Sequence, residues 1–321
     1  MKVGIAALVP LVLLVLAAER IWTGTRKGAS RSTGLDNPFT QILLTLGLAK
    51  LCRVPYITDD LLSPQLQRLT GVANLLTLAG MTFGALSAIP VLAFSSYITG
   101  RNLSARIQVV AAGVVVMVMV GTYLPSPMAR EAVPFLQNHF AVTGAVLPYW
   151  IAFIAPLTLS TLVGFAYTVR ELVWVRRGPF ARALAGVVVA YLLGFAYCAF
   201  NVANLVGNYT GTDSFVVRNS EIIENSLGLA SLAAAGFSAA TYAWHILRDR
   251  ARRYRLLRRH GRTWLEARKV SPEVVLDKSY HFRPTRRACW SAARSAQAAY
   301  RLQMELADHK HQAARQLRVL R

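Results

Sequence analysis

The chain has 321 residues, of which 54% are hydrophobic and 16% charged, and the apolar residues occur in blocks about as long as a membrane-spanning helix. This composition excludes an ordinary soluble domain and predicts an integral membrane protein. A net charge of +21 is typical of nucleic-acid-binding proteins, but here the basic residues gather after the last apolar block, so membrane topology explains them better.

Seven apolar segments are expected to cross the membrane as helices. The first could also be a signal peptide, but four basic residues between positions 20 and 31 follow it and resist export. The second is interrupted by Lys50 and Arg53, and the third carries Pro90, which favours a kink. The fourth is rich in valine, yet in lipid it is expected to be helical. The predicted spans are residues 3–18, 38–57, 69–97, 107–124, 146–174, 183–206 and 227–247.

Basic residues predict the orientation of these spans. An arginine-rich segment follows the seventh span, and such a segment stays on the cytoplasmic side. Seven spans then place the N-terminus outside, with 30 of the 36 lysines and arginines inside, whereas a cleaved signal peptide would place the arginine-rich end outside. We therefore predict an all-α polytopic membrane helix bundle in residues 1–247 and a small basic helical cytoplasmic tail in residues 248–321, in the plasma membrane. Within this tail, apolar spacing predicts one amphipathic helix from about Thr285 onward.

Polar and ionisable residues in or beside the spans converge on the outer half of the predicted bundle. Such groups are costly in lipid and often mark a functional site. Lys50 is expected about 10 Å below the outer interface, with Arg53 one turn later on nearly the same face. Lys50 and Arg53 could meet Glu224 or an anionic solute in an outward-facing pocket. Alternatively, they could snorkel to the outer headgroups while the asparagines join helices by hydrogen bonds. The candidate pocket residues are Lys50, Arg53, Asn74, Tyr197, Asn201, Asn204, Glu221 and Glu224.

The arginines after the seventh span are expected to contact the anionic lipid of the inner leaflet, which attracts each basic residue by about 1 kcal/mol. A cytoplasmic protein partner is the second interpretation. No nucleic acid is expected, because the tail carries no recognition motif for one. The candidate lipid contacts are Arg248, Arg250, Arg252, Arg253, Arg255, Arg258, Arg259 and Arg262.

Catalytic signatures are largely missing from the sequence. It contains no GxxxxGK[ST] phosphate loop, no HExxH and no GxSxG. Its three cysteines are too widely spaced to indicate a disulfide framework or a zinc site. His309 and His311 lie two residues apart on a predicted helix, so their side chains diverge. We expect no enzyme activity, no cofactor and no metal site.

Two short patches carry a resemblance. One is Leu69-Thr-Gly-Val-Ala-Asn-Leu-Leu, with Gly71 and Asn74 forming Gly-x-x-Asn at the start of the third span; the other is Trp264-Leu, followed by Pro-Glu-x-x-Leu at residues 272–276. In these patches the chain resembles a group of actinobacterial seven-span integral membrane proteins described as transporters of unknown function. The resemblance implies seven spans, a cytoplasmic tail and transport. Physically, Gly71 could allow close helix approach while the Asn74 amide reaches across, or Asn74 could contact a substrate.

Two functions remain open from the sequence. The first is a small-molecule transporter with its solute site in the outer-half pocket. The second is a membrane-bound sensor or scaffold that relays a signal through the basic tail.

Overall fold

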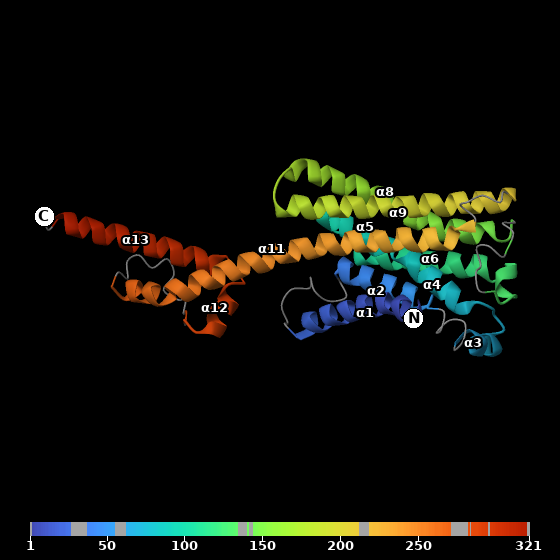
Figure 1. The fold of residues 1–321 in the computed structure, drawn as a ribbon, viewed down its shortest axis with the longest axis horizontal. Helices are drawn as coiled ribbons and strands as arrows, with labels where there is room; N and C mark the ends of the chain where they lie inside the picture. Colours follow the sequence, from blue (N-terminus) through green and yellow to red (C-terminus); the bar gives the residue numbers. More distant parts are fainter. Residues whose placement is uncertain are drawn as a thin grey trace. The chain divides into compact units, whose positions relative to one another are not determined.

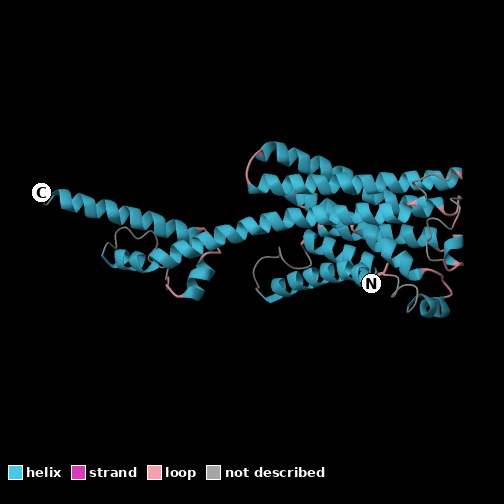
Figure 2. Ribbon diagram, viewed as in Figure 1, coloured by secondary structure: helices cyan, strands magenta, loops and turns pink. Residues whose placement is uncertain are grey.

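The computed structural model describes residues 2–26, 37–54, 62–133, 140, 144–211, 218–270, 282, 284–294 and 296–319. Throughout these ranges the regular structure is helical, without strands (Figure 2). The chain divides into two compact units, Met1–Ser238 and Ala239–Arg321, and one helix, α11, contributes residues to both.

Helices of the first unit lie side by side in a bundle (Figure 1). In the part of the chain that the structure describes, five helical stretches are long and apolar enough to cross a membrane: Leu75–Ile98, Ala105–Tyr123, Leu147–Val175, Pro179–Thr210 and Ile222–Val270, the last of which continues into the second unit. The prediction of a helical protein with several membrane-length apolar segments is therefore confirmed. The helices and turn of this unit are α1 (Lys2–Arg26), α2 (Pro38–Leu51), α3 (Ser63–Thr70), α4 (Leu75–Leu86), α5 (Ala88–Ile98), α6 (Ala105–Tyr123), the 3-10 turn η2 (Pro127–Ala129), α8 (Leu147–Val175), α9 (Pro179–Thr210) and the first part of α11 (Ser220–Val270).

The predicted fourth, fifth and sixth spans correspond closely to α6, α8 and α9. Local signals explain where these helices begin and end. The Ser104 hydroxyl accepts a hydrogen bond from the Ile107 backbone N–H at 3.3 Å and so caps α6. Gly211, with a φ of 64°, ends α9 in the left-handed conformation that glycine adopts readily.

The second predicted span is shorter than expected. Pro38 begins α2, where the Asn37 side chain accepts from the Phe39 N–H at 2.9 Å, but the helix ends at Leu51. Fourteen residues of helix extend about 21 Å, less than the hydrocarbon thickness of about 30 Å. The expected depth of Lys50 assumed a helix continuing to residue 57, and that assumption is wrong because Lys50 lies in the last turn of α2. Residues 55–57 lie outside the described part of the chain.

The third predicted span begins later than expected and is interrupted. Gly71 ends α3 with a φ of 70°, and Asn74, with a φ of 53°, precedes the first residue of α4. A second interruption, at Ser87, separates α4 from α5 three residues before Pro90. Proline lacks the backbone N–H that would bond the carbonyl four residues earlier, which explains an interruption at this point. The kink expected from Pro90 stays a prediction, because Ser87 keeps a helical φ of −62° and ψ of −21°.

Aromatic residues and small residues join the helices of the first unit. Tyr123, Tyr149 and Trp150 are fully or almost fully buried in a core formed mainly by α4, α6 and α8. Outside this core, the Tyr191 hydroxyl of α9 lies 2.6 Å from the Ser95 hydroxyl of α5. This contact passes Gly164 of α8, where an added Cβ would lie 2.5 Å from the Tyr191 ring. Close approach at a glycine therefore allows three helices to meet.

The first part of α11 packs against α9 through small residues. The Ser231 hydroxyl donates to the Ala190 carbonyl oxygen at 2.9 Å, and the Ser238 hydroxyl donates to the Ala183 carbonyl oxygen. A Cβ on Gly186 would lie 2.9 Å from Ser238 Cβ. Such small residues bring two helix backbones close together, as is common between membrane helices.

The second unit contains the later part of α11, α12 (Arg286–Ala292) and α13 (Gln297–Val319). The single tail helix predicted from Thr285 onward is wrong, because the helix ends at Ala292 and a new one begins at Gln297. Thr285 is nevertheless its start, since its hydroxyl accepts from the Ala288 N–H at 3.2 Å. The Pro-Glu-x-x-Leu patch at 272–276 lies outside the described residues. A small core unites the three helices through Leu257, Trp264, Phe282, Cys289, Ala293, Ala298 and Leu302.

Candidate functional site

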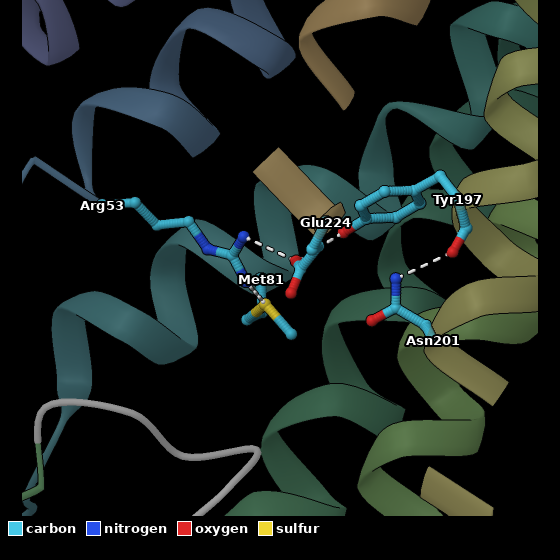
Figure 3. A network of polar contacts seen from close by, with 5 residues as sticks. All are labelled: Arg53, Met81, Tyr197, Asn201 and Glu224. Carbon is cyan, nitrogen blue, oxygen red and sulfur yellow. Dashed lines mark hydrogen bonds and ion pairs between the residues drawn. The ribbon is translucent and has the colours of Figure 1, made fainter. Parts of the chain in front are cut away.

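Three ionisable or polar side chains from distant parts of the sequence meet inside the first unit. Figure 3 shows Arg53 and Tyr197 approaching Glu224 from opposite sides. Glu224 Oε1 lies 3.2 Å from Arg53 Nη1 and accepts a hydrogen bond from the Tyr197 hydroxyl at 2.9 Å. The Glu224 side chain is only 10% exposed and that of Arg53 30% exposed. The predicted contact between a basic residue of the second span and Glu224 is thus present, and Arg53 makes it.

The turn after α2 positions Arg53. Its backbone N–H bonds the Lys50 carbonyl oxygen at 3.2 Å, so the chain folds back as α2 ends. On α4, a Cβ added to Gly80 would lie 3.1 Å from the Ala49 carbonyl oxygen, so this glycine lets α4 approach the end of α2 closely. The second guanidinium nitrogen of Arg53 then contacts the Met81 sulfur on the next residue of α4.

Lys50 lies beside the same carboxylate without bonding it. A Cβ on Gly228, one turn after Glu224 on α11, would lie 3.9 Å from Lys50 Nζ. Lys50 interacts electrostatically with both Arg53 and Glu224, but Nζ has no hydrogen-bond partner among the described residues. We call Lys50, Arg53, Tyr197 and Glu224 the Glu224 cluster. Counted over the described side chains, it holds two cations against one carboxylate in a largely apolar bundle.

Tyr149 is a neighbour of the cluster that sequence reasoning did not identify. It lies in the first turn of α8, is fully buried and interacts electrostatically with Arg53. In the described part of the chain its hydroxyl has no hydrogen-bond partner. Tyr149 lies at the start of the predicted span 146–174, on the outer side where the pocket was expected, and this position was the one signal that the sequence offered.

Two of the predicted asparagines belong to the α9 side of this region. Asn201 Nδ2 donates to the Tyr197 carbonyl oxygen at 2.9 Å, one turn earlier on the same helix (Figure 3). Asn204 is 1% exposed, and its Oδ1 has no partner in the described ranges. The Glu221 side chain lies outside what the structure describes.

Asn74 does not join the Glu224 cluster. Its Nδ2 donates to the carbonyl oxygens of Met128 and Glu131 at 3.1 and 2.7 Å, and its Oδ1 accepts from the Val133 N–H at 3.2 Å. The amide therefore reaches across as predicted, and it holds the segment after α6. The close-approach interpretation of Gly71 is wrong, because no atom of the described residues lies within 4 Å of the position of an added Cβ; its positive φ is what requires glycine.

A separate groove of about 590 Å³ lies between α8 and α9. Its lining is almost wholly apolar, and no member of the Glu224 cluster contributes to it. The groove is lined by Leu147, Ile151, Ile154, Ala155, Thr158, Leu159, Leu162, Val202, Leu205, Val206 and Tyr209.

In the second unit, the eight predicted lipid-contacting arginines divide into two sets. The Arg250 guanidinium lies 4.1 Å from the centre of the Trp290 ring and donates to the Trp290 carbonyl oxygen at 3.1 Å. Arg253 is half-buried. The remaining arginines are exposed, and all except Arg258 follow a four-and-three spacing that places them on one helix face: Arg248, Arg252, Arg255, Arg258, Arg259 and Arg262.

The tail core also holds a buried polar contact. Trp264 Nε1 donates to Glu305 Oε2 at 2.7 Å, and Arg268 Nε lies 3.5 Å from the same oxygen. Among the residues that the structure describes, no three His, Cys, Asp or Glu side chains gather as metal ligands. No family model, curated protein or solved structure matches the chain. The resemblance to actinobacterial seven-span proteins therefore stays a prediction.

Proposed function

We propose that this protein is a seven-helix transporter of the plasma membrane, with its N-terminus outside, its C-terminus in the cytoplasm and its solute site at the Glu224 cluster. One observation carries the proposal: an ion pair and its neighbours are assembled from α2, α9 and α11 inside an apolar bundle. Ionisable groups persist in such surroundings mainly where a solute or ion passes.

Exposed apolar surface supports membrane insertion of the bundle. On α6, Val109 and Met117 are 71% and 70% exposed, as expected of residues covered by lipid. Seven spans require α1 and the α2 region to cross the membrane in addition to the five long apolar stretches, and α1, with 25 residues, has the necessary length. The count of basic residues on the two sides supports the orientation.

The end of α2 at the cluster also favours transport. Many transporters bind their substrates where a helix is interrupted, because the interruption supplies polar groups within the membrane. Here the break brings Arg53 to Glu224, which also accepts from Tyr197. A solute that attracts Arg53 would compete with Glu224 for the guanidinium, so binding and release would rearrange this ion pair.

Uptake into proteoliposomes tests transport directly. The full chain would be reconstituted and offered a defined mixture of amino acids, organic acids, sugars and nucleosides, and the lumen would be analysed by mass spectrometry. At least one solute should accumulate with the wild type and with Arg68→Gln, which changes an exposed arginine of α3. Uptake should fall at least about tenfold with Arg53→Gln, the effect of about 1.4 kcal/mol. Accumulation no greater than in protein-free vesicles would refute transport.

A topology experiment tests the orientation separately. A reporter fused after Arg321 should be active only in the cytoplasm. Activity only on the external face would overturn the proposed arrangement of spans.

A sensor or scaffold is the second candidate, and the folded tail favours it. The buried Trp264 and its bond to Glu305 indicate a packed module that could recognise a cytoplasmic partner. Removal of residues 263–321 discriminates the two functions. Transport predicts that solute uptake survives the truncation, whereas a relay predicts that the cellular phenotype is lost while the bundle still folds.

Anionic lipid is the proposed partner of the exposed tail arginines, each attracted by about 1 kcal/mol. Arg250 should contribute less, because it is already engaged with Trp290. In reconstituted vesicles, phosphatidylglycerol should slow trypsin cleavage after Arg252 and Arg259 relative to phosphatidylcholine alone, and high salt should reverse the protection. Equal cleavage in both vesicles would contradict lipid contact.

A further inference from the structure

The charge balance of the Glu224 cluster points to the class of its ligand. Glu224 Oε1 pairs with the Arg53 guanidinium and accepts a hydrogen bond from the Tyr197 hydroxyl, so the charge of this carboxylate is balanced by that of the guanidinium. Lys50 Nζ, 3.9 Å from the position of a Cβ on Gly228 of α11, then supplies a second positive charge beside Glu224, without a hydrogen bond to a described residue. Lys50 is half-buried, and an ammonium with three N–H donors in a largely apolar bundle favours a partner that carries negatively charged oxygen.

Among the residues that the structure describes, the neighbouring groups add a donor and no further carboxylate. The buried Tyr149 hydroxyl, beside Arg53, lacks an acceptor within the described ranges. A second cation would increase the positive charge, and a neutral ligand would leave it unchanged. A ligand with one negative charge and oxygen acceptors would neutralise it and accept from the unmatched donors.

We propose, on the basis of the function proposed above, that the Glu224 cluster binds a singly charged anionic oxygen group, with the Lys50 ammonium as its direct contact. Two sources carry this chemistry: the carboxylate of a small solute and the phosphate diester of an anionic lipid headgroup. Arg53 stays paired with Glu224 in the resting state and orients the site. One unmatched cation favours one negative charge, so monoanions bind in preference to dianions.

Ligand-induced stabilisation measures this binding without relying on transport. The full chain in a non-ionic detergent would be titrated, at constant sodium concentration, with sodium acetate or lactate against sodium chloride. A second arm would compare short-chain phosphatidylglycerol with short-chain phosphatidylcholine. The midpoint of thermal unfolding should rise saturably in at least one arm, because a ligand that binds only the folded state stabilises it.

Variants of Lys50 test the assigned contact. Lys50→Gln should raise the half-saturating ligand concentration about tenfold to a hundredfold, the range for loss of a charge-assisted hydrogen bond. Lys50→Arg, which keeps the charge, should retain most of the response and serves if the glutamine variant does not fold. Arg68→Gln, at an exposed arginine, should respond as the wild type does.

Each outcome decides the proposal. A response to carboxylates identifies a solute site, and a response to phosphatidylglycerol alone identifies a headgroup site; both support anion binding. No response beyond the controls, or an equal response in Lys50→Gln, overturns it. If anions stabilise the protein but no solute accumulates in vesicles, transport fails and this inference stands. If neutral solutes accumulate but anions do not stabilise the protein, transport stands and this inference fails.

Discussion

Breaking the ion pair between Arg53 and Glu224 should destabilise the bundle more than removing both partners. Loss of one partner from a buried pair costs about 3–5 kcal/mol, because the other charge remains unmatched. Arg53 is 30% exposed and Glu224 10% exposed, so solvent reduces this cost. We expect Arg53→Met to lower the free energy of unfolding by about 2 kcal/mol. Glu224→Leu should lower it by about the same amount, and it also removes the acceptor of the Tyr197 hydroxyl.

The double variant Arg53→Met, Glu224→Leu should lose less stability than the sum of the two, with a coupling energy of about 1–2 kcal/mol. Unfolding by dodecyl sulfate in mixed micelles, followed by tryptophan fluorescence, measures all four proteins. Arg68→Met is the control for loss of an exposed basic residue and should change stability by less than about 0.5 kcal/mol. Additivity of the single variants within about 0.5 kcal/mol would refute the pairing.

Three further predictions concern packing and the tail. Gly164→Ala should destabilise the bundle by about 1–3 kcal/mol in the same assay because its Cβ would meet the Tyr191 ring, whereas Gly113→Ala, with nothing within 4 Å, should be nearly neutral; equal effects would contradict this. Burial raises the pKa of the Cys289 thiol, so the folded tail favours the neutral thiol. The resulting stabilisation of the tail is fully present below the unfolded pKa of about 8.5 and should be lost as pH rises through the higher pKa of the folded state. Hydrogen exchange of α12 measures this; protection that does not decline with alkaline pH would oppose it. Trp264→Phe should destabilise the tail by about 1–2 kcal/mol, because its buried carboxylate partner loses a donor, and limited proteolysis should then cleave the tail faster; unchanged cleavage would count against the contact.

Long apolar segments were predictable from the sequence, because their composition alone distinguishes them from loops. The predicted span 146–174 is α8 almost to the residue, and 107–124 is nearly α6. The helix ends within apolar sequence were not predictable. Leu69 belongs to the apolar run that defined the third span, yet left-handed backbone at Gly71 and Asn74 separates it from α4. Hydropathy contains no information on such turns.

The candidate site was predictable in its charged residues and not in its geometry. Counting along the spans placed Lys50, Arg53 and Glu224 in the same half of the bundle, although the depth it gave for Lys50 assumed a longer helix than α2. Arg53 is the partner of Glu224 because the chain turns after α2 and because Gly80 lets α4 approach the end of α2 closely. Neither the turn nor the close approach can be read from the sequence. Tyr149 was missed because a buried hydroxyl without an acceptor has no sequence signature.

The contact between Tyr191 and Ser95 across Gly164 bears on how the bundle would move under the proposed transport function. Three helices, α5, α8 and α9, share that level and have almost no room to slide, because a hydroxyl pair and a ring fill it. They would therefore act as a fixed frame, and any rocking motion would belong to the short α2 and the early turns of α11. Those segments carry Arg53 and Glu224, so the ion pair would move as one, and the hydrogen bond from Tyr197 of α9 to Glu224 would join the moving part of the protein to the stationary one.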